Sequence, residues 1–305
     1  MSERIYTVNT DRLTKKYRDK QALDALTVSI ADGGITGLIG RNGSGKTTFL
    51  KICAGLLDKT SGKAEIMGRD PMDDFETLSN LVYTYHDMKY EKSLRLKEII
   101  GNYGMMFRDF DSVFAENLLR YFDLEPKLKY AQLSQGMASI FNFICGLACR
   151  SKLTIFDEPV LGMDITVRKS AYEVLLRDYS EYPRTIVISS HLLSEIEGVL
   201  TDILLIDEGR LVLHENIDDL RQISYMAEGG KERIDAFCEG RNVVFRKDME
   251  TGSSAVIYEK FDENASAAAN AGGVRLSAVR PEDLCIYLTR ENKEGELECL
   301  WKKPE

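Results

Sequence analysis

The stretch Gly40-Arg41-Asn42-Gly43-Ser44-Gly45-Lys46-Thr47 constrains this chain more than any other. It fits the pattern G-x-x-x-x-G-K-[ST], in which glycines let backbone N–H groups approach phosphate oxygens closely. The apolar run at 35–39 predicts a buried strand before the loop. Residues 48–57 predict a helix after it, whose positive end faces the anion. A chance Gly/Ser-rich turn is the alternative, and this strand–loop–helix order disfavours it.

The loop predicts a role for each of its polar groups. Lys46 is expected to contact the β- and γ-phosphates of a nucleotide, and the Thr47 hydroxyl to bind Mg²⁺. The backbone of the loop and of the first helical turn is expected to hold the phosphates. The nucleotide-binding residues expected here are Gly40, Asn42, Gly43, Ser44, Gly45, Lys46, Thr47 and Thr48.

Composition limits the kinds of molecule that this chain is expected to bind and the compartment in which it is expected. The 305 residues carry a net charge of −9, which repels a phosphate backbone, so we expect no general nucleic-acid binding. No apolar stretch approaches the ~20 residues that span a bilayer, and residues 1–4 lack an apolar signal core. We therefore expect a cytoplasmic protein. None of the six cysteines forms a CxxC pair; Cys145 and Cys149 could face one side of a helix, but buried small hydrophobes are favoured over a metal site.

The order of predicted elements indicates an α/β fold with two parts. Alternating residues before position 35 predict a small antiparallel sheet, and residues 81–85 a further strand. Residues 94–130 and 139–149 show helical spacing, which predicts a helical subdomain at about 87–150. Apolar runs at 153–156, 185–188 and 203–206, with a helix near 167–179 between the first two, predict a doubly wound parallel sheet. We assign 1–220 to this domain.

The sequence pattern changes after residue 220, and residues 221–305 predict a small α+β appendage. Strands are expected at 221–226, 242–246 and 255–258, and Gly pairs separate these segments. Helices are expected at 264–271 and at 281–290, where Pro281 occupies the first turn.

A second chemical signal follows a predicted strand. The apolar run 153–156 ends in Asp157 and Glu158, and ligands of open parallel sheets bind at the carboxyl ends of strands. Asp157 is placed to organise Mg²⁺, and Glu158 to polarise a water that attacks the γ-phosphate. A solvated acidic turn is the alternative reading. The phosphate loop elsewhere in the chain makes it the weaker one.

A third signal is Leu133-Ser134-Gln135-Gly136-Met137, just before the predicted helix 139–149. With it the chain resembles the ATP-binding subunits of ATP-binding cassette transporters. In that family a phosphate loop, a signature close to L-S-G-G-Q and a strand ending in Asp-Glu occur in this order. Ser134 and Gly136 match the signature, whereas Gln135 and Met137 depart from it. The resemblance implies that Ser134 and Gly136 bind the γ-phosphate of a partner subunit's nucleotide.

Other positions agree with the same resemblance, which spans about residues 4–220. It implies that Tyr17 stacks on adenine, that Asp164 belongs to a loop between two sites, and that His191 senses the γ-phosphate. The family has a Gln after the strand 81–85, where this chain has His86. Imidazole is a poorer Mg²⁺ ligand than an amide oxygen, and a plain surface histidine is the alternative for His86.

The resemblance implies an ATPase that powers a separate membrane permease, with two cassettes closing around two ATP molecules and Mg²⁺. The partners implied are a permease and a second cassette, identical or different, and the location is the inner face of the cell membrane. The overall resemblance favours export, with no single residue that decides the direction, and residues 281–289 are loosely similar to the end of bacterial export-type subunits. The helical stretch near 86–130 would face the permease, although its Phe114, Leu118 and Phe122 are expected to be core.

Two other functions stay open. A soluble cassette ATPase of ribosomes or DNA is disfavoured by the acidic composition and by the lack of a second cassette or a long coiled coil. A non-catalytic ATP-binding regulatory module is disfavoured by the intact Asp157–Glu158 pair, and the appendage can serve as a dimer brace instead.

Overall fold

The structure is a computed structural model that describes residues 6–249 and 251–289. The chain divides into two compact units, Met1–His214 and Glu215–Glu305. The first unit holds every predicted site residue. The short helix α7 (Ile217–Leu220), which the sequence assigns to the first domain, belongs to the second unit.

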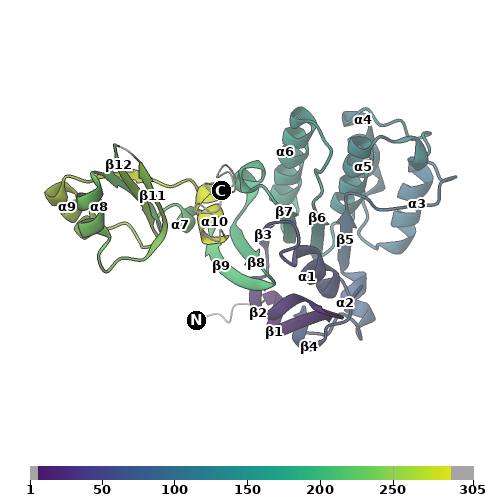
Figure 1. Ribbon diagram of the computed structural model, residues 1–305. Coiled ribbons are helices and arrows are strands. Elements are labelled where there is room, and N and C mark those ends of the chain that lie inside the picture. Colours follow the sequence, from purple (N-terminus) through teal and green to yellow (C-terminus); the bar gives the residue numbers. More distant parts are fainter. Residues whose placement is uncertain (1–5, 250, 290–305) are drawn as a thin grey trace, which may run out of the picture. The chain divides into compact units, whose positions relative to one another are not determined.

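The first unit is built on a six-stranded sheet of order β5-β6-β7-β3-β8-β9 (Figure 1). Strands β5, β6, β7, β3 and β8 pair in parallel, as the doubly wound prediction requires. Because both faces of the inner strands are buried, these strands are continuous apolar runs rather than alternating ones. The bounds are β3 (Gly34–Ile39), β5 (Leu81–Tyr85), β6 (Leu153–Asp157), β7 (Thr185–Ser190), β8 (Asp202–Asp207) and β9 (Arg210–Asn216).

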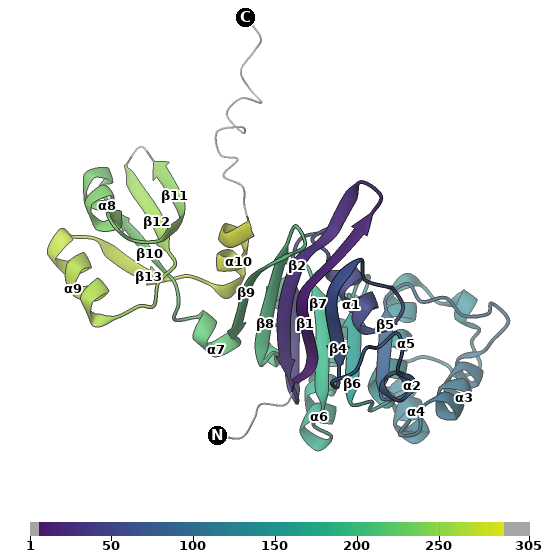
Figure 2. The same cartoon turned by 90° about the horizontal axis from the view of Figure 1, so that it is seen from below.

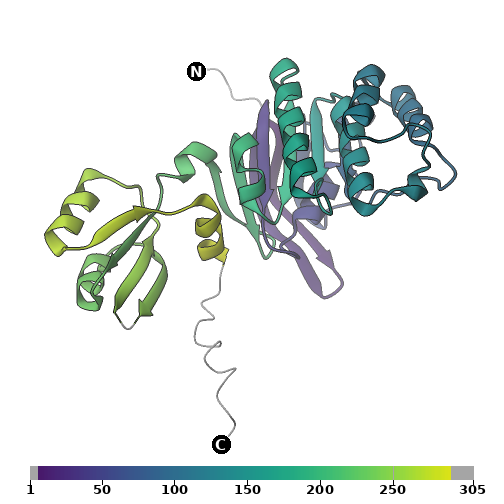
Figure 3. The same cartoon turned by 90° about the horizontal axis from the view of Figure 1, so that it is seen from above.

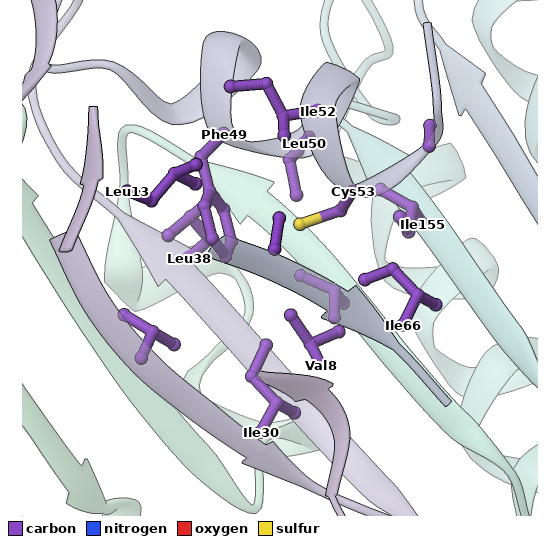
Figure 4. Packing of buried hydrophobic residues seen from close by; sticks show 14 of the residues in the cluster. Val8, Leu13, Ile30, Leu38, Phe49, Leu50, Ile52, Cys53, Ile66 and Ile155 are labelled. Carbon is purple, nitrogen blue, oxygen red and sulfur yellow. The ribbon is translucent and has the colours of Figure 1, made fainter. Parts of the chain in front are cut away.

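A three-stranded antiparallel sheet of order β2-β1-β4 packs beside the parallel one (Figure 2). Its strands are β1 (Tyr6–Tyr17), β2 (Lys20–Ala31) and β4 (Ser61–Ile66). Helix α1 (Lys46–Cys53) lies over these strands, and its apolar side points toward Val8 and Ile66 (Figure 4). The helix ends four residues before the predicted limit at 57, because Gly55 adopts a φ of 66° that breaks the helical path.

The remaining helices of the first unit lie against the sheets and beyond the β5 edge (Figure 3). They are α2 (Phe75–Ser79), α3 (Leu96–Met106), α4 (Ser112–Tyr121), α5 (Gln135–Ala148) and α6 (Ile165–Glu181). Helix α5 begins four residues earlier than predicted, because Ser134 caps it by accepting a hydrogen bond from the Met137 N–H. Leu118 is buried as expected, whereas Phe114 and Phe122 are only half-buried. Among the described helices, none is long and apolar enough to cross a membrane.

The second unit has the order β-α-β-β-α-β, which is the ferredoxin-like arrangement. Its antiparallel sheet has the order β11-β12-β10-β13. The sequence misplaces the first strand, which starts at Tyr225 rather than 221, and gives no sign of α8 or β13. The elements are β10 (Tyr225–Gly229), α8 (Lys231–Cys238), β11 (Val243–Met249), β12 (Gly252–Ile257), α9 (Glu263–Gly272), β13 (Arg275–Ala278) and α10 (Pro281–Thr289).

The two faces of this small sheet are covered differently. Helices α8 and α9 enclose a core rich in alanine, which includes Ala227, Ala255 and Ala265. Helix α10 covers the opposite face (Figure 1), where Tyr287 stacks on Phe245 with ring centroids 4.3 Å apart. The small core residues let both helices approach the sheet closely.

Candidate active site

Parallel pairing brings the chemical residues of the first unit to one edge of the sheet. Tyr85 lies opposite Asp157 across the β5–β6 ladder, and Asp157 lies opposite Ser189 across the β6–β7 ladder. His86 and Glu158 therefore leave neighbouring strands at the same level. The phosphate loop follows β3 at this edge, since β3 is the next strand beyond β7. This is the carboxyl end of the strands, where open α/β sheets bind ligands.

The Lys46 ammonium is buried inside the phosphate loop. Its Nζ donates a hydrogen bond of 2.6 Å to the Gly40 carbonyl and lies 3.7 Å from the Glu158 carboxylate. Burial lowers the pKa of Lys46, and the negative charges of Glu158 and Asp157 offset only part of that effect. The neighbouring carboxylates thus compensate the burial of the ammonium only in part. An incoming phosphate would add negative charge beside it.

The geometry of the loop fits a phosphate chain. Gly45 adopts a φ of 110°, and a Cβ there would lie 2.5 Å from the Ala22 carbonyl oxygen, so only glycine suits the position. The same residue begins α1 without a side-chain cap, which leaves the first N–H groups of the helix for an anion. Within the described part of the chain, the buried Ser44 hydroxyl has no hydrogen-bond partner. Unpaired donors around one loop are the expected signature of an anion site.

The two carboxylates after β6 are held by different groups. The buried Asp157 accepts hydrogen bonds from the Ser189 hydroxyl at 2.6 Å and from the Tyr83 hydroxyl at 3.0 Å. Burial, and next the charge of Asp157, raise the pKa of Tyr83, so this hydroxyl stays protonated and donates. The Glu158 side chain has a different partner, because its carboxylate lies 3.0 Å from Nδ1 of His191.

The backbone of Glu158 is strained. Its φ of 50° lies in the left-handed region, which non-glycine residues rarely adopt. The Glu158 N–H donates a 2.9 Å hydrogen bond to the Ser189 hydroxyl. Such strain costs of order 1–3 kcal/mol and is found mostly at functional sites. Here it turns the Glu158 side chain out of the strand direction and toward Lys46 and His191.

One cavity of about 470 Å³ unites most of the predicted residues, and its volume suits a nucleotide-sized ligand. Tyr17 lies at its rim with 44% of its surface exposed, and the Lys15 ammonium is 5.3 Å from the centre of the Tyr17 ring. The Asn142 amide donates to the His86 carbonyl and fixes the backbone there. The predicted residues lining the cavity are Tyr17, Asn42, Gly43, Gly45, Lys46, Thr47, Thr48, His86, Glu158 and His191.

The other predicted residues of the loop and strand lie around this cavity rather than on its wall. Gly40 contributes the carbonyl that binds Lys46, and Ser44 lines an adjoining hollow with Lys20 and Arg41. Asp157 is buried at the end of β6.

Ser134, Gly136 and Asp164 line a separate cavity of about 410 Å³. The Ser139 hydroxyl donates to the Leu161 carbonyl, and a Cβ on Gly136 would lie 2.7 Å from the Gly162 carbonyl oxygen, so α5 and the loop before α6 are in close contact. Asp164 caps α6 by accepting hydrogen bonds from two backbone N–H groups. The structure of one chain therefore does not bring the signature to the phosphate loop.

Sequence reasoning missed several residues around the site. Lys20, Ala22 and Leu161 line the main cavity, and Tyr83 and Ser189 bind Asp157. Only Ser189 carried a signal, because it stands at the end of a predicted apolar strand next to His191. The contacts of Tyr83 depend on the pairing of β5 with β6.

Comparison with known proteins gives one consistent answer. The family model described as "ABC transporter" matches residues 23–161. The uncharacterized ABC transporter ATP-binding protein YcbN of Bacillus subtilis is 32% identical over 227 residues, which cover 71% of each chain. The bacitracin transport ATP-binding protein BcrA of Bacillus licheniformis is 30% identical over 223 residues, 70% of this chain and 71% of that one.

A solved structure of an ATP-binding subunit of an ABC transporter is 25% identical, with a TM-score of 0.62 over 70% of this chain and 92% of that one. The family-model match at residues 23–161 includes the phosphate loop and the strand that ends in Asp157. The chain belongs to the ATP-binding proteins of the ABC transporter family, and its first unit has the fold of their ATPase cassette.

Proposed function

We propose that this chain hydrolyses ATP for an ABC transporter: two cassettes close around two Mg-ATP molecules and drive a separate membrane permease. The observation that carries the proposal is the cavity in which Lys46, Glu158 and His191 meet the free end of α1. Few other reactions need a buried cation, a phosphate loop and a strained carboxylate together.

Each residue has a part in the proposed reaction. Lys46 and the loop N–H groups bind the phosphates, and Tyr17 stacks on the base. Glu158 polarises the attacking water, while His191 orients Glu158 and contacts the γ-phosphate. ATP contains the bond that is hydrolysed. It also favours closure, because it binds the closed pair of cassettes more tightly than the open pair.

Mg²⁺ is proposed to bind through Thr47 and Asp157 together with the phosphates. No cluster of three or more metal-binding side chains exists among residues 6–249 and 251–289. Proteins usually bind Mg²⁺ through one or two carboxylates plus substrate phosphates, and Asp157 would be such a carboxylate here. His86 is a further group near the phosphates, and its role stays a prediction.

The proposed dimer follows from the separation of the two cavities. Ser134, Gly136 and Asp164 face a cavity of their own, so a second cassette would have to bring its copies of them to the nucleotide. The permease would hold the pair at the inner face of the cell membrane. The name of the bacitracin transport relative supports a transport role, and export is the proposed direction.

Hydrolysis by the purified chain, assayed with Mg²⁺ and with EDTA, tests the proposal. Glu158→Gln should lower kcat by about 10²- to 10⁴-fold while nucleotide affinity changes little, because the amide is isosteric but cannot act as a base. The matched control is Glu173→Gln on the exposed side of α6, which should keep full activity. Equal turnover in both variants would remove Glu158 from its role.

A further inference from the structure

The Ser189 hydroxyl connects the two acidic residues of the site. It donates to Oδ1 of Asp157 at 2.6 Å and accepts from the Glu158 N–H at 2.9 Å. Ser189 is fully buried, so water does not compete for either bond. One hydroxyl thus fixes the direction of the Asp157 carboxylate and the strained backbone of Glu158 together.

Tyr83 fixes only the first of these residues. Its hydroxyl donates to Oδ2 of Asp157 at 3.0 Å, on the other carboxylate oxygen. Tyr83 reaches Asp157 from β5, and Ser189 reaches it from β7, so the carboxylate is held from both neighbouring strands. With one donor on each oxygen, the carboxylate cannot rotate without losing a hydrogen bond.

We propose that Ser189 and Tyr83 are positioning residues for hydrolysis: both aim Asp157 at the metal, and Ser189 alone also holds Glu158 in its strained conformation. This rests on the proposed function, in which Asp157 organises Mg²⁺ and Glu158 acts on water. Groups that orient a metal ligand affect metal affinity by about 10- to 100-fold. Loss of the backbone bond to Glu158 affects turnover instead.

Two variants separate these effects. Tyr83→Phe removes one donor to Asp157, and Ser189→Ala removes the other donor and the acceptor for Glu158. The contribution of the metal to binding is measured as an affinity ratio. This ratio is the affinity for Mn²⁺-ADP, from electron paramagnetic resonance, divided by the affinity for ADP in EDTA. Turnover is measured as kcat at saturating Mg-ATP.

Both variants should lower the affinity ratio by about 10-fold. At saturating Mg-ATP, Tyr83→Phe should recover kcat to within about 2-fold, whereas Ser189→Ala should stay at least about 10-fold slow. Ser189→Thr, which keeps a hydroxyl, should restore part of the loss. This split between metal affinity and kcat is not expected from a general loss of stability.

Matched controls remove a hydroxyl elsewhere in the same sheet. Tyr85→Phe alters the other tyrosine of β5, and Thr154→Val alters a buried hydroxyl of β6 that donates to the Ser151 carbonyl just before this strand. Both should leave the ratio and kcat unchanged, and thermal melts identify any variant that fails to fold.

If the wild type hydrolyses ATP with Mg²⁺ but Ser189→Ala and Tyr83→Phe behave like the controls, the positioning role is wrong and the proposed function stands. Recovery of kcat by Ser189→Ala at saturating Mg-ATP would also refute the separate hold on Glu158. If the wild type neither binds nor hydrolyses ATP, the proposed function itself fails.

Discussion

The two cavities of the first unit differ in the charged and polar groups that line them. The phosphate-loop cavity holds a buried ammonium, a strained Glu158 and an imidazole beside it. The signature cavity is lined by a hydroxyl, a glycine and an aspartate that caps a helix. The first has the cation and the loop N–H groups that a charged ligand needs, whereas the polar side chains of the second are neutral except for one carboxylate. The proposal is therefore that one chain carries two unequal halves of a site.

Removing the buried cation should have the largest effect on nucleotide binding. Lys46→Ala is expected to weaken ATP affinity at least about 30-fold, because truncating a buried charged contact costs about 2–5 kcal/mol. Titration with a fluorescent nucleotide measures it. Lys51→Ala, an exposed lysine of the same helix, is the control and should bind normally. Affinity within about 2-fold of the wild type for Lys46→Ala would show that the first cavity is not the phosphate site.

A charge placed in the signature cavity should act on hydrolysis alone. Ser134→Asp keeps the cap of α5, since Asp is as good an N-cap as Ser, but it places a carboxylate where the partner's γ-phosphate is expected. Hydrolysis should fall at least about 10-fold, which corresponds to about 1.4 kcal/mol of repulsion. Melting temperature and ATP affinity of the single chain should stay close to wild type.

Ser134→Thr serves as the control for this substitution, since it keeps both the cap and the neutral hydroxyl. Loss of ATP affinity in Ser134→Asp would mean that the two cavities are not independent within one chain.

Tyr17, which is proposed to stack on the base, is expected to contribute less to nucleotide affinity than Lys46. Tyr17→Ala should weaken ATP binding by about 10-fold, because stacking of a base on an aromatic ring is worth about 1–3 kcal/mol. Inorganic triphosphate, which has no base, should bind both proteins equally. Calorimetric titration of both ligands makes this comparison, and an equal loss for triphosphate would assign Tyr17 a structural role.

The smallest expected effect on nucleotide affinity concerns Lys15, which contacts Tyr17. The Lys15 ammonium lies near the Tyr17 ring and also donates to the Asp58 carbonyl, so it can hold the ring in place. Lys15→Gln should weaken ATP binding by about 2- to 5-fold, the size of an exposed cation–π contact. Lys16→Gln, one position along the same strand, should have no effect. Equal affinities in the two variants would leave Tyr17 without this support.

The sequence predicts the strands and the loop at the carboxyl edge of the sheet well because their signals are local. A buried parallel strand is a continuous apolar run, so the strand predicted at 153–156 is found at Leu153–Asp157. The phosphate loop needs glycine at fixed positions, and Gly45 shows the steric reason. The doubly wound core and the antiparallel sheet are also predicted from local patterns, and the structure confirms both.

What the sequence could not predict depends on tertiary pairing. Tyr83 and Ser189 meet Asp157 only after three strands align, and no local pattern records that register. Helix α8 has only Ile234 and Phe237 buried in an otherwise polar segment, and β13 is four residues long, so neither shows a clear periodicity. The first strand of the second unit begins at Tyr225 rather than at 221, because residues 221–223 form a turn in which the Gln222 N–H donates to the Asp219 carbonyl.

The central claim is that the two cavities complete each other across a pair of cassettes. Light scattering of the Glu158→Gln variant, in which bound ATP is not consumed, tests it most directly. With Mg-ATP the mass should rise to twice the 34.5 kDa of the single chain, and Ser134→Asp added to this variant should prevent the rise. A nucleotide-bound species that stays at 34.5 kDa, or a pair that forms despite Ser134→Asp, would contradict the account.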